Sequence, residues 1–190
     1  MNVLIFGGGF NPITIGHIRL FEKLKSKYDE IWIIPCYKHN FNKDMLPFEQ
    51  RFEMCKLIEK DNVKICDIEK QYEINNTYDL IMKLKELHPK NKYSFLIGLD
   101  NANCIEKWYK YEELLTIIKF IVFGRTGVEI KSNWFKQKPH KFIKQEVGDI
   151  SSTLVRQIFN NNYLDPLAKE YLDVKIYDHI IINGLYRKEK

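Results

Sequence analysis

Short apolar segments alternate with helix-like segments along the chain, and this alternation constrains the fold more than any other feature. Five segments rich in Ile, Val, Phe and Leu have the length of strands buried on both faces, and a sixth at 141–145 is weaker. Strands separated by helices pair in parallel through right-handed crossovers, so the sequence predicts an α/β fold with a doubly wound parallel sheet. The five strands are expected at 2–6, 30–35, 63–66, 92–98 and 119–124. The helices are expected at 16–27, 47–60, 77–87, 110–117, 151–160 and 173–183, with a long surface loop at 125–140.

Length and composition favour one compact domain over residues 1–190. The net charge of +5 suits an anionic ligand, but the lysines are mixed with acidic residues and form no basic arm, so nucleic acid is not an expected partner. The four cysteines form no C-x-x-C pair, which argues against a disulfide framework or a zinc site. No leader sequence and no apolar stretch of membrane-spanning length is recognisable. A cytoplasmic protein is therefore expected, with no membrane partner.

A glycine-rich turn joins the first predicted strand to the first predicted helix. Residues 6–17 read Phe-Gly-Gly-Gly-Phe-Asn-Pro-Ile-Thr-Ile-Gly-His. The consecutive glycines can take positive φ, and without a Cβ they let a phosphate or a nucleobase lie against the backbone. Backbone N–H groups and the positive end of the following helix favour an anion there. The run matches neither the Walker pattern nor the dinucleotide fingerprint, so on its own it is more typical of an ordinary tight turn.

Two widely separated motifs together resemble a known superfamily. The glycine-rich run is similar to the N-terminal signature of the nucleotidylyltransferases, whose core is (His/Thr)-x-Gly-His. Residues 150–156, Ile-Ser-Ser-Thr-Leu-Val-Arg, resemble the second signature, Ile-Ser-Ser-Thr-x-x-Arg. Within the superfamily the chain is most similar to the nicotinate or nicotinamide mononucleotide adenylyltransferases. Further similarity lies at 35–39, 77–80, 97–100 with Trp108, and 183–186.

This resemblance covers nearly the whole chain and implies a Rossmann-like enzyme of NAD biosynthesis. The reaction implied is the transfer of AMP from ATP to nicotinate mononucleotide, or to nicotinamide mononucleotide, with release of pyrophosphate. Such a reaction needs positioning and charge stabilisation rather than a covalent intermediate. Magnesium is expected with ATP, bound through phosphates and water, so no protein metal site is predicted.

The resemblance implies a triphosphate site at the first motif. His17 is expected to donate a hydrogen bond to the phosphates as negative charge moves toward pyrophosphate. Thr14, three residues earlier, stands where many bacterial members carry His. Because Thr cannot be a cation, more of the charge stabilisation is expected to fall on His17, Arg156 and metal. The expected catalytic residues are therefore His17, Thr14 and Arg156, and the ATP-binding candidates in this motif are Gly8, Gly9, Phe10, Gly16 and His17.

A second anion site is expected at residues 150–156. Asp149 or Ser151 can cap the helix that begins there, which leaves its first-turn N–H groups facing outward. Arg156 is placed three and four residues after two hydroxyls, so its guanidinium can join them in gripping a phosphate. Alone, a Ser-Ser-Thr run is more typical of a capped surface helix. Paired with the first motif, it predicts ATP binding by Ile150, Ser151, Ser152, Thr153 and Arg156.

The mononucleotide is expected beside Trp108, whose flat ring can stack on a pyridine, whereas Trp32 lies in a predicted strand and is expected in the core. Asp100 is placed to orient ribose hydroxyls after the fourth strand. Leu99 departs from the usual Ala, and Asn11 replaces the Asp common in bacterial members. The remaining substrate-binding candidates are Asn11, Lys38, His39, Lys43, Thr77 and Gly98.

Other readings remain open at this stage. A related enzyme could use another phosphate acceptor such as phosphopantetheine, or CTP with an alcohol phosphate, although Trp108 and residues 183–186 argue against it. A non-catalytic nucleotide- or RNA-binding module would retain ligand without turnover, but the intact His17 and Arg156 count against that class. A redox Rossmann protein would need the missing glycine fingerprint. The compact chain resembles bacterial members of the family and favours nicotinate, whereas residues 10–14 are more similar to eukaryotic members. The oligomeric state is open, a homo-oligomer included.

Overall fold

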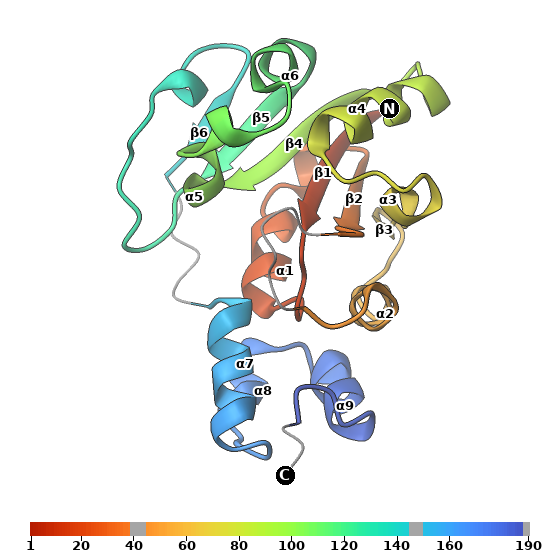
Figure 1. Ribbon diagram of the computed structural model, residues 1–190, viewed down its shortest axis with the longest axis vertical. Helices are drawn as coiled ribbons and strands as arrows, with labels where there is room; N and C mark the ends of the chain where they lie inside the picture. The colour runs from red at the N-terminus through yellow and green to blue at the C-terminus, as the bar shows by residue number, and fades with distance from the viewer. Residues whose placement is uncertain (39–44, 145–149, 188–190) are drawn as a thin grey trace.

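The computed structural model describes residues 1–38, 45–144 and 150–187, which contain a six-stranded parallel sheet. Its strands are β1 (Asn2–Gly8), β2 (Glu30–Pro35), β3 (Val63–Ile65), β4 (Lys92–Gly98), β5 (Lys119–Phe123) and β6 (Lys141–Ile143). Their order across the sheet is β3-β2-β1-β4-β5-β6 (Figure 1). Each strand falls on a segment where one was expected, and the predicted Rossmann-like α/β fold is confirmed.

The strand order reverses between β1 and β4. From β1 the chain winds outward to β3, crosses back to β4 and then winds outward to β6 on the other side. A doubly wound sheet binds ligands at such a reversal, in the crevice beyond the carboxyl ends of the strands. The last residues of the two strands that flank it are Gly8 and Gly98.

Helices cover both faces of the sheet. Alternate β1 residues divide between two apolar cores, with Leu4 and Phe6 in one and Val3 and Ile5 in the other. The first core includes residues of α1 (Ile15–Glu22), α2 (Phe48–Lys56), α7 (Ser152–Asn161), α8 (Ala168–Tyr171) and α9 (Val174–Ile182). The second includes residues of α3 (Ile68–Gln71), α4 (Thr77–Leu87), α5 (Leu99–Ala102), η2 (Ile105–Lys107), α6 (Tyr111–Ile117) and η3 (Trp134–Lys136).

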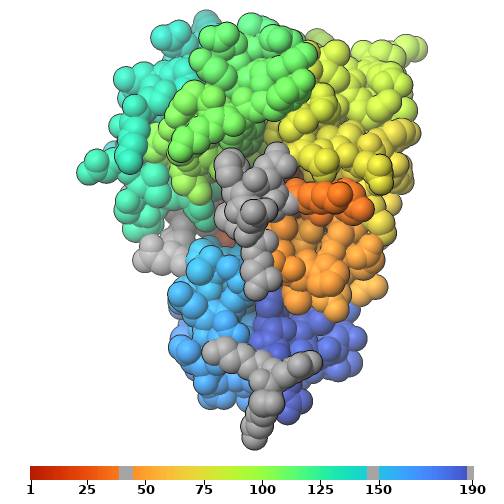
Figure 2. Space-filling view, in the orientation of Figure 1, coloured from red at the N-terminus to blue at the C-terminus, as the bar shows by residue number. Residues whose placement is uncertain are grey.

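The C-terminal helices share a core with the first half of the chain. Phe159 and Ile180 belong to the same apolar cluster as Met54 of α2, and Figure 2 shows the blue C-terminal segment lying against the orange one. As expected, residues 183–184 end α9. Gly184 takes a φ of +64°, which lets the Leu185 N–H reach the Ile180 carbonyl at 3.0 Å.

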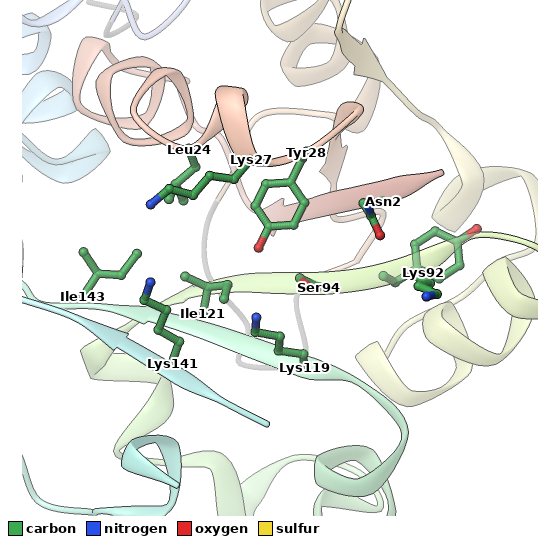
Figure 3. Close-up of a pocket in the computed structure, with 11 residues that line it drawn as sticks. Asn2, Leu24, Lys27, Tyr28, Lys92, Ser94, Lys119, Ile121, Lys141 and Ile143 are labelled. Carbon is green, nitrogen blue, oxygen red and sulfur yellow. The ribbon is translucent and has the colours of Figure 1, made fainter. Parts of the chain in front are cut away.

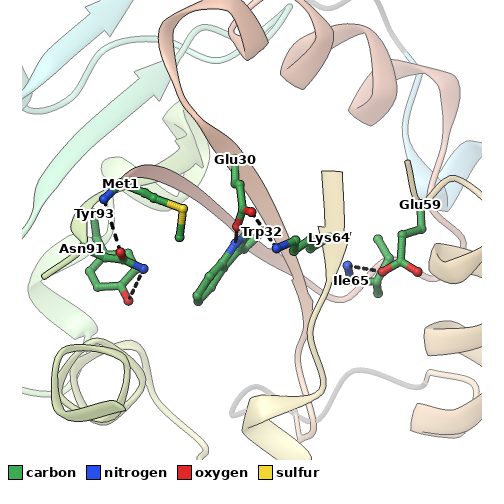
Figure 4. A network of polar contacts seen from close by, with 8 residues as sticks. All are labelled: Met1, Glu30, Trp32, Glu59, Lys64, Ile65, Asn91 and Tyr93. Atoms are coloured by element: carbon green, nitrogen blue, oxygen red, sulfur yellow. Dashed lines mark hydrogen bonds and ion pairs between the residues drawn. The ribbon is translucent and has the colours of Figure 1, made fainter. Parts of the chain in front are cut away.

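An ion pair joins strand β2 to strand β3 beside the buried Trp32. Trp32 is 7% exposed, so its predicted place in the core is confirmed. Its indole N–H donates to Glu30 Oε2 at 2.7 Å, and the other oxygen of Glu30 pairs with Lys64 of β3 at 2.6 Å (Figure 4). The polar tip of the ring is therefore satisfied at the surface while its body stays apolar.

Several boundaries differ from the predicted ones. The helix expected at 16–27 ends at Glu22 and is followed by the 3-10 turn η1 (Lys25–Lys27), and the helix expected at 47–60 ends at Lys56. Short helices at α3, α5 and α8 were not predicted, because four residues are too few to show a helical period.

The surface loop expected at 125–140 is partly buried. Phe135 of η3 is fully buried in the second core, and the Trp134 indole N–H donates to the Ala102 carbonyl at 3.0 Å. The prediction failed because two aromatic residues anchor a segment whose other residues are mostly polar. Within the part of the chain that the structure describes, no helix is both long and apolar enough to cross a bilayer.

Candidate functional site

The glycine-rich segment at the end of β1 is closely packed. Gly7 and Gly8 belong to the strand rather than to the turn, and none of the three glycines has positive φ. The left-handed residue is Phe10, at a φ of 45°, held with its ring 5.4 Å from those of Phe6 and His17. A Cβ on Gly7 would lie 2.9 Å from the Phe95 ring. The glycines are therefore needed for close approach, and the expectation that they supply the turn's positive φ is wrong.

Thr14 is the N-cap residue of helix α1, and His17 lies in its first turn. The Thr14 N–H donates to His17 Nδ1 at 3.0 Å, and the Thr14 hydroxyl lies 2.8 Å from the same nitrogen. A nitrogen that accepts a backbone N–H carries no proton, so we assign the proton to Nε2. Thr14 is fully buried while His17 is partly exposed. Thr14 and His17 therefore contact each other directly, and this contact leaves Nε2–H as the donor available to a ligand.

His17 is a neutral side chain in the unliganded protein. Burial, which disfavours the charged ring, and then the nearby positive charge of Arg125 together lower its pKa from 6.5 to about 4. His17 therefore offers a hydrogen bond rather than a positive charge.

The His17 pKa can be read from an NMR titration. Because the folded-state pKa lies below the ordinary value, the ring stays neutral down to about pH 5 and takes up a proton only as the pH falls through about 4. We expect its imidazole resonances to be flat between pH 5.5 and 8. A His17 midpoint near 6.5 would contradict the buried, neutral assignment.

The two signature motifs meet at the carbonyls of residues 11 and 12. Arg156 Nη1 donates to the Asn11 carbonyl at 2.7 Å, and the Ser152 hydroxyl donates to the Pro12 carbonyl at 2.8 Å. Arg156 Nη2 also reaches Thr153 Oγ1 at 3.2 Å, as the helical spacing predicted. Ser151 caps α7 by accepting the Leu154 N–H at 3.1 Å. The alternative cap, Asp149, lies outside the described residues, and Ile150, directly before Ser151, is partly buried.

A residue near the C-terminus also holds the first motif. The Tyr186 hydroxyl donates to Asn11 Oδ1 at 2.7 Å, and the Leu46 N–H reaches the same oxygen at 3.4 Å. Asn11 is 5% exposed. Its amide oxygen is therefore a structural link between three segments in this state of the protein.

Arg51 of α2 fixes the loops around the strand ends. Its guanidinium donates to the carbonyls of Gly9, Cys36 and Leu46 at 2.8, 2.8 and 2.9 Å, and the residue is 1% exposed. Burial of a cation is costly unless its hydrogen bonds are made, and here three backbone oxygens make them. The side chain thus joins the turn after β1 to the segment after β2.

An ion pair lies at the end of β4. Arg125, two residues after β5, donates to Asp100 Oδ2 at 2.8 Å, with both side chains about 40% exposed. A Cβ on Gly98 would collide with the Asp100 carboxylate. Gly98 therefore lets Asp100 fold back over the strand end, where Arg125 orients it.

Trp108 is seated on the second core. Its ring packs edge-on against Phe95 and Phe120, with centroids 6.5 and 6.4 Å apart, and the side chain stays partly exposed. Thr77 is the first residue of α4, after the Asn76 cap, and Lys38 is exposed with its amine 5.3 Å from the Tyr37 ring. His39 and Lys43, also predicted to bind substrate, lie outside the described residues.

Three residues at this site were missed by sequence reasoning. Arg51 sits three residues after Phe48 on the apolar face of its helix, which is an available signal for a buried cation. Arg125 follows a strand at the ligand-binding edge of the sheet, another readable signal. Tyr186 lies in the stretch 183–186 that resembles the family, but its contact with Asn11 could not be foreseen, because only tertiary packing brings the two together.

The described residues of the site present hydrogen-bond donors rather than a cluster of metal ligands. Among residues 1–38, 45–144 and 150–187, no group of three or more His, Cys, Asp or Glu is arranged to hold a metal ion. Asp100, the carboxylate at the β4 end, is already paired with Arg125. These residues fit a magnesium ion that is carried by phosphate oxygens and water, as that ion usually is.

A glycine-rich turn at the strand reversal of a doubly wound sheet, bonded to the first turns of a second helix, is the arrangement of a nucleotide-binding α/β protein. The chain belongs to the Cytidylyltransferase-like family, whose model matches residues 5–158.

Relatives and solved structures resemble almost the whole chain. A probable nicotinate-nucleotide adenylyltransferase of Clostridium acetobutylicum is 37% identical, over 96% of this chain and 97% of the relative. The nicotinate-nucleotide adenylyltransferase of Bacillus subtilis is 30% identical over 96% of both. The structure of Plasmodium falciparum nicotinic acid mononucleotide adenylyltransferase complexed with NaAD is 29% identical, with a TM-score of 0.85 over 97% of both chains.

Proposed function

We propose that this protein transfers the adenylyl group of ATP to nicotinate mononucleotide, forming the dinucleotide precursor of NAD and releasing pyrophosphate. The observation that carries the proposal is the direct bonding of the two signature motifs, Arg156 to the Asn11 carbonyl and Ser152 to the Pro12 carbonyl. The adenylyltransferase names of relatives that cover almost the whole chain support it. On this proposal residues 1–190 act as one nucleotidylyltransferase domain.

The reaction is a displacement at the α-phosphorus. An oxygen of the mononucleotide phosphate attacks it, the bond to the bridging oxygen breaks, and that oxygen leaves with pyrophosphate. We assign to His17 Nε2–H a hydrogen bond to the phosphates, which strengthens as negative charge moves to the leaving group. Arg156 supplies the fixed positive charge, since the neutral His17 cannot. Thr14 acts through His17 by fixing its tautomer and ring position.

The remaining site residues divide between the two substrates. The backbone of Gly8, Gly9 and Phe10, with the α7 start at 150–153, is assigned to the triphosphate. Asp100, Thr77 and Trp108 are assigned to the mononucleotide. Magnesium bound to ATP would neutralise charge on the phosphates, held by their oxygens and by water.

Pyrophosphate release tests the proposal. ATP with Mg²⁺ should react with nicotinate mononucleotide, and replacing ATP by CTP, or the acceptor by phosphopantetheine, should lower kcat/KM by orders of magnitude. The ratio of kcat/KM for nicotinate and nicotinamide mononucleotides gives the pyridine preference, which we expect to favour nicotinate. Binding of ATP without release from any acceptor would leave a binding-only module and overturn the proposal.

Replacement of Trp108 by alanine is expected to raise the KM for the mononucleotide about tenfold and to change the KM for ATP less than twofold. Loss of a stacked aromatic face costs about 1–3 kcal/mol. The control is Trp108→Phe, which keeps a ring at the same place and should recover most of the affinity. If ATP alone were affected, Trp108 would belong to the other substrate.

A further inference from the structure

A cavity of about 360 Å³ lies at the amino ends of the strands, opposite the site described above. Its walls include the first residues of four neighbouring strands: Asn2 of β1, Lys92 of β4, Lys119 of β5 and Lys141 of β6. Lys27 of η1 closes the opposite side. We call the cavity the lysine pocket, after Lys27, Lys92, Lys119 and Lys141. Figure 3 shows Lys27, Lys119 and Lys141 around the space between η1 and the sheet.

The strand register explains why three lysines reach the same face of the sheet. Asn2 pairs with Lys92, Ser94 with Lys119, and Ile121 with Lys141. Paired residues on neighbouring strands share a face, and so do residues two apart on one strand. The three strand lysines therefore point to one side, the side on which η1 packs.

The four lysines have no acidic partner within the described part of the chain. Seven other lysines do form ion pairs, among them Lys25, Lys64 and Lys83. No Asp or Glu is among the residues that line the lysine pocket. Asp29, at the same edge, accepts the Asn2 N–H at 2.7 Å. Like charges brought to one cavity repel one another, and an anion bound there removes that repulsion.

The inner part of the lysine pocket offers apolar contacts and neutral hydrogen-bond donors in addition to positive charge. Leu24, on the side of η1, and Ile121 and Ile143, on the sheet, give the cavity apolar walls (Figure 3). The Tyr28 hydroxyl is bonded to Ser94, and burial raises the pKa of Tyr28, so the phenol keeps its proton. A protonated phenol and a serine hydroxyl add neutral donors to the four amines.

The lysine pocket is separate from the adenylyl-transfer site. Strand β1 runs from Asn2, in the pocket, to Gly8, where the turn that leads to His17 begins. At about 3.3 Å per residue the two ends are on the order of 20 Å apart. One phosphate chain cannot serve both places.

We propose that the lysine pocket binds a short chain of phosphate groups, either an inorganic oligophosphate or the polyphosphate tail of a nucleotide. Lysine amines are compact point charges with three donors each, which suits several phosphates in a row. The volume is at the small end of the range for ligand pockets, about 300–1,000 Å³, which excludes a large ligand. The exposed amines make the binding dependent on salt.

The test is calorimetric titration of the full-length protein with inorganic tripolyphosphate. Each protein also carries Arg156→Ala, which weakens the anion site at the other sheet edge. The double substitution Lys119→Glu with Lys141→Glu should weaken tripolyphosphate binding at least tenfold. The matched control is Lys136→Glu with Lys175→Glu, which makes the same change in net charge at two exposed lysines outside the pocket and should weaken binding less than twofold. Thermal melts establish that every variant folds, and Lys119→Gln with Lys141→Gln repeats the test without added negative charge.

A comparison of ATP with tripolyphosphate distinguishes a nucleotide from an inorganic oligophosphate as the ligand. Equal affinity for ATP and tripolyphosphate would support a site for the phosphate chain alone, and tighter ATP binding would support a nucleotide whose base contacts the apolar walls. Equal weakening by the test and control substitutions, or no binding by the Arg156→Ala protein, would overturn the proposal. The experiment measures binding and not turnover, so its failure is independent of the proposed adenylyl transfer.

Discussion

Replacement of His17 by alanine is expected to lower kcat about a hundredfold while the protein stays folded. The substitution removes the Nε2–H donor assigned to the phosphates, and loss of one such preorganised donor costs about 10²–10³ in rate. The measurement is the steady-state rate of pyrophosphate release at saturating ATP and nicotinate mononucleotide.

A second histidine provides the matched control for this prediction. His88, exposed at the end of α4, packs edge-on against Trp32 with ring centroids 5.4 Å apart. His88→Ala should leave kcat within twofold of the wild-type value. A similar kcat for His17→Ala would remove His17 from the mechanism.

Replacement of Arg51 by methionine is expected to give the largest loss of stability, about 3–5 kcal/mol in the free energy of unfolding. Methionine fills much of the volume but leaves the carbonyls of Gly9, Cys36 and Leu46 without their donor. Each unsatisfied buried carbonyl costs about 1–3 kcal/mol, and some of that is recovered as the loops relax. Chemical denaturation at neutral pH, read by circular dichroism, measures the effect.

Two further substitutions define what the Arg51 experiment reports. Arg19→Met changes an exposed arginine on α1 and should alter stability by less than about 0.5 kcal/mol. Arg51→Lys keeps the charge but cannot reach three carbonyls from one amine, so most of the loss should remain. If Arg51→Met were as stable as Arg19→Met, the three hydrogen bonds would contribute little to the folded state.

The arrangement of the sheet could be predicted because its signals are local. Each strand is an apolar run, and each long helix shows its own period, as Leu80, Ile81 and Leu84 do on the buried face of α4. The parallel pairing then follows from the alternation of strands and helices and the rule for right-handed crossovers. The order of the strands, and with it the reversal beside Gly8 and Gly98, was not predicted. Boundaries were less predictable, because Leu24 and Tyr28, which flank η1, continue the apolar spacing of α1 after the hydrogen bonding has changed.

The candidate site could be predicted only in part. The pairing of Thr14 with His17 and of Thr153 with Arg156 follows from helical spacing, and both are present. The bonds that join the motifs could not be predicted, since they use backbone carbonyls of residues 11 and 12 whose direction depends on the folded turn. The positive φ was expected at the glycines and occurs at Phe10, because aromatic packing rather than glycine freedom holds that turn.

The bonds from Arg156 and Tyr186 to Asn11 also set an order of events during protein synthesis. Asn11 leaves the ribosome 145 residues before Arg156 and 175 before Tyr186. At a synthesis rate of about 5–20 residues per second, roughly ten to thirty seconds pass between the synthesis of Asn11 and that of Arg156 and Tyr186. A nascent or truncated chain that ends before residue 156 therefore lacks the guanidinium of this site, however complete its sheet, and should not compete with the finished protein for ATP.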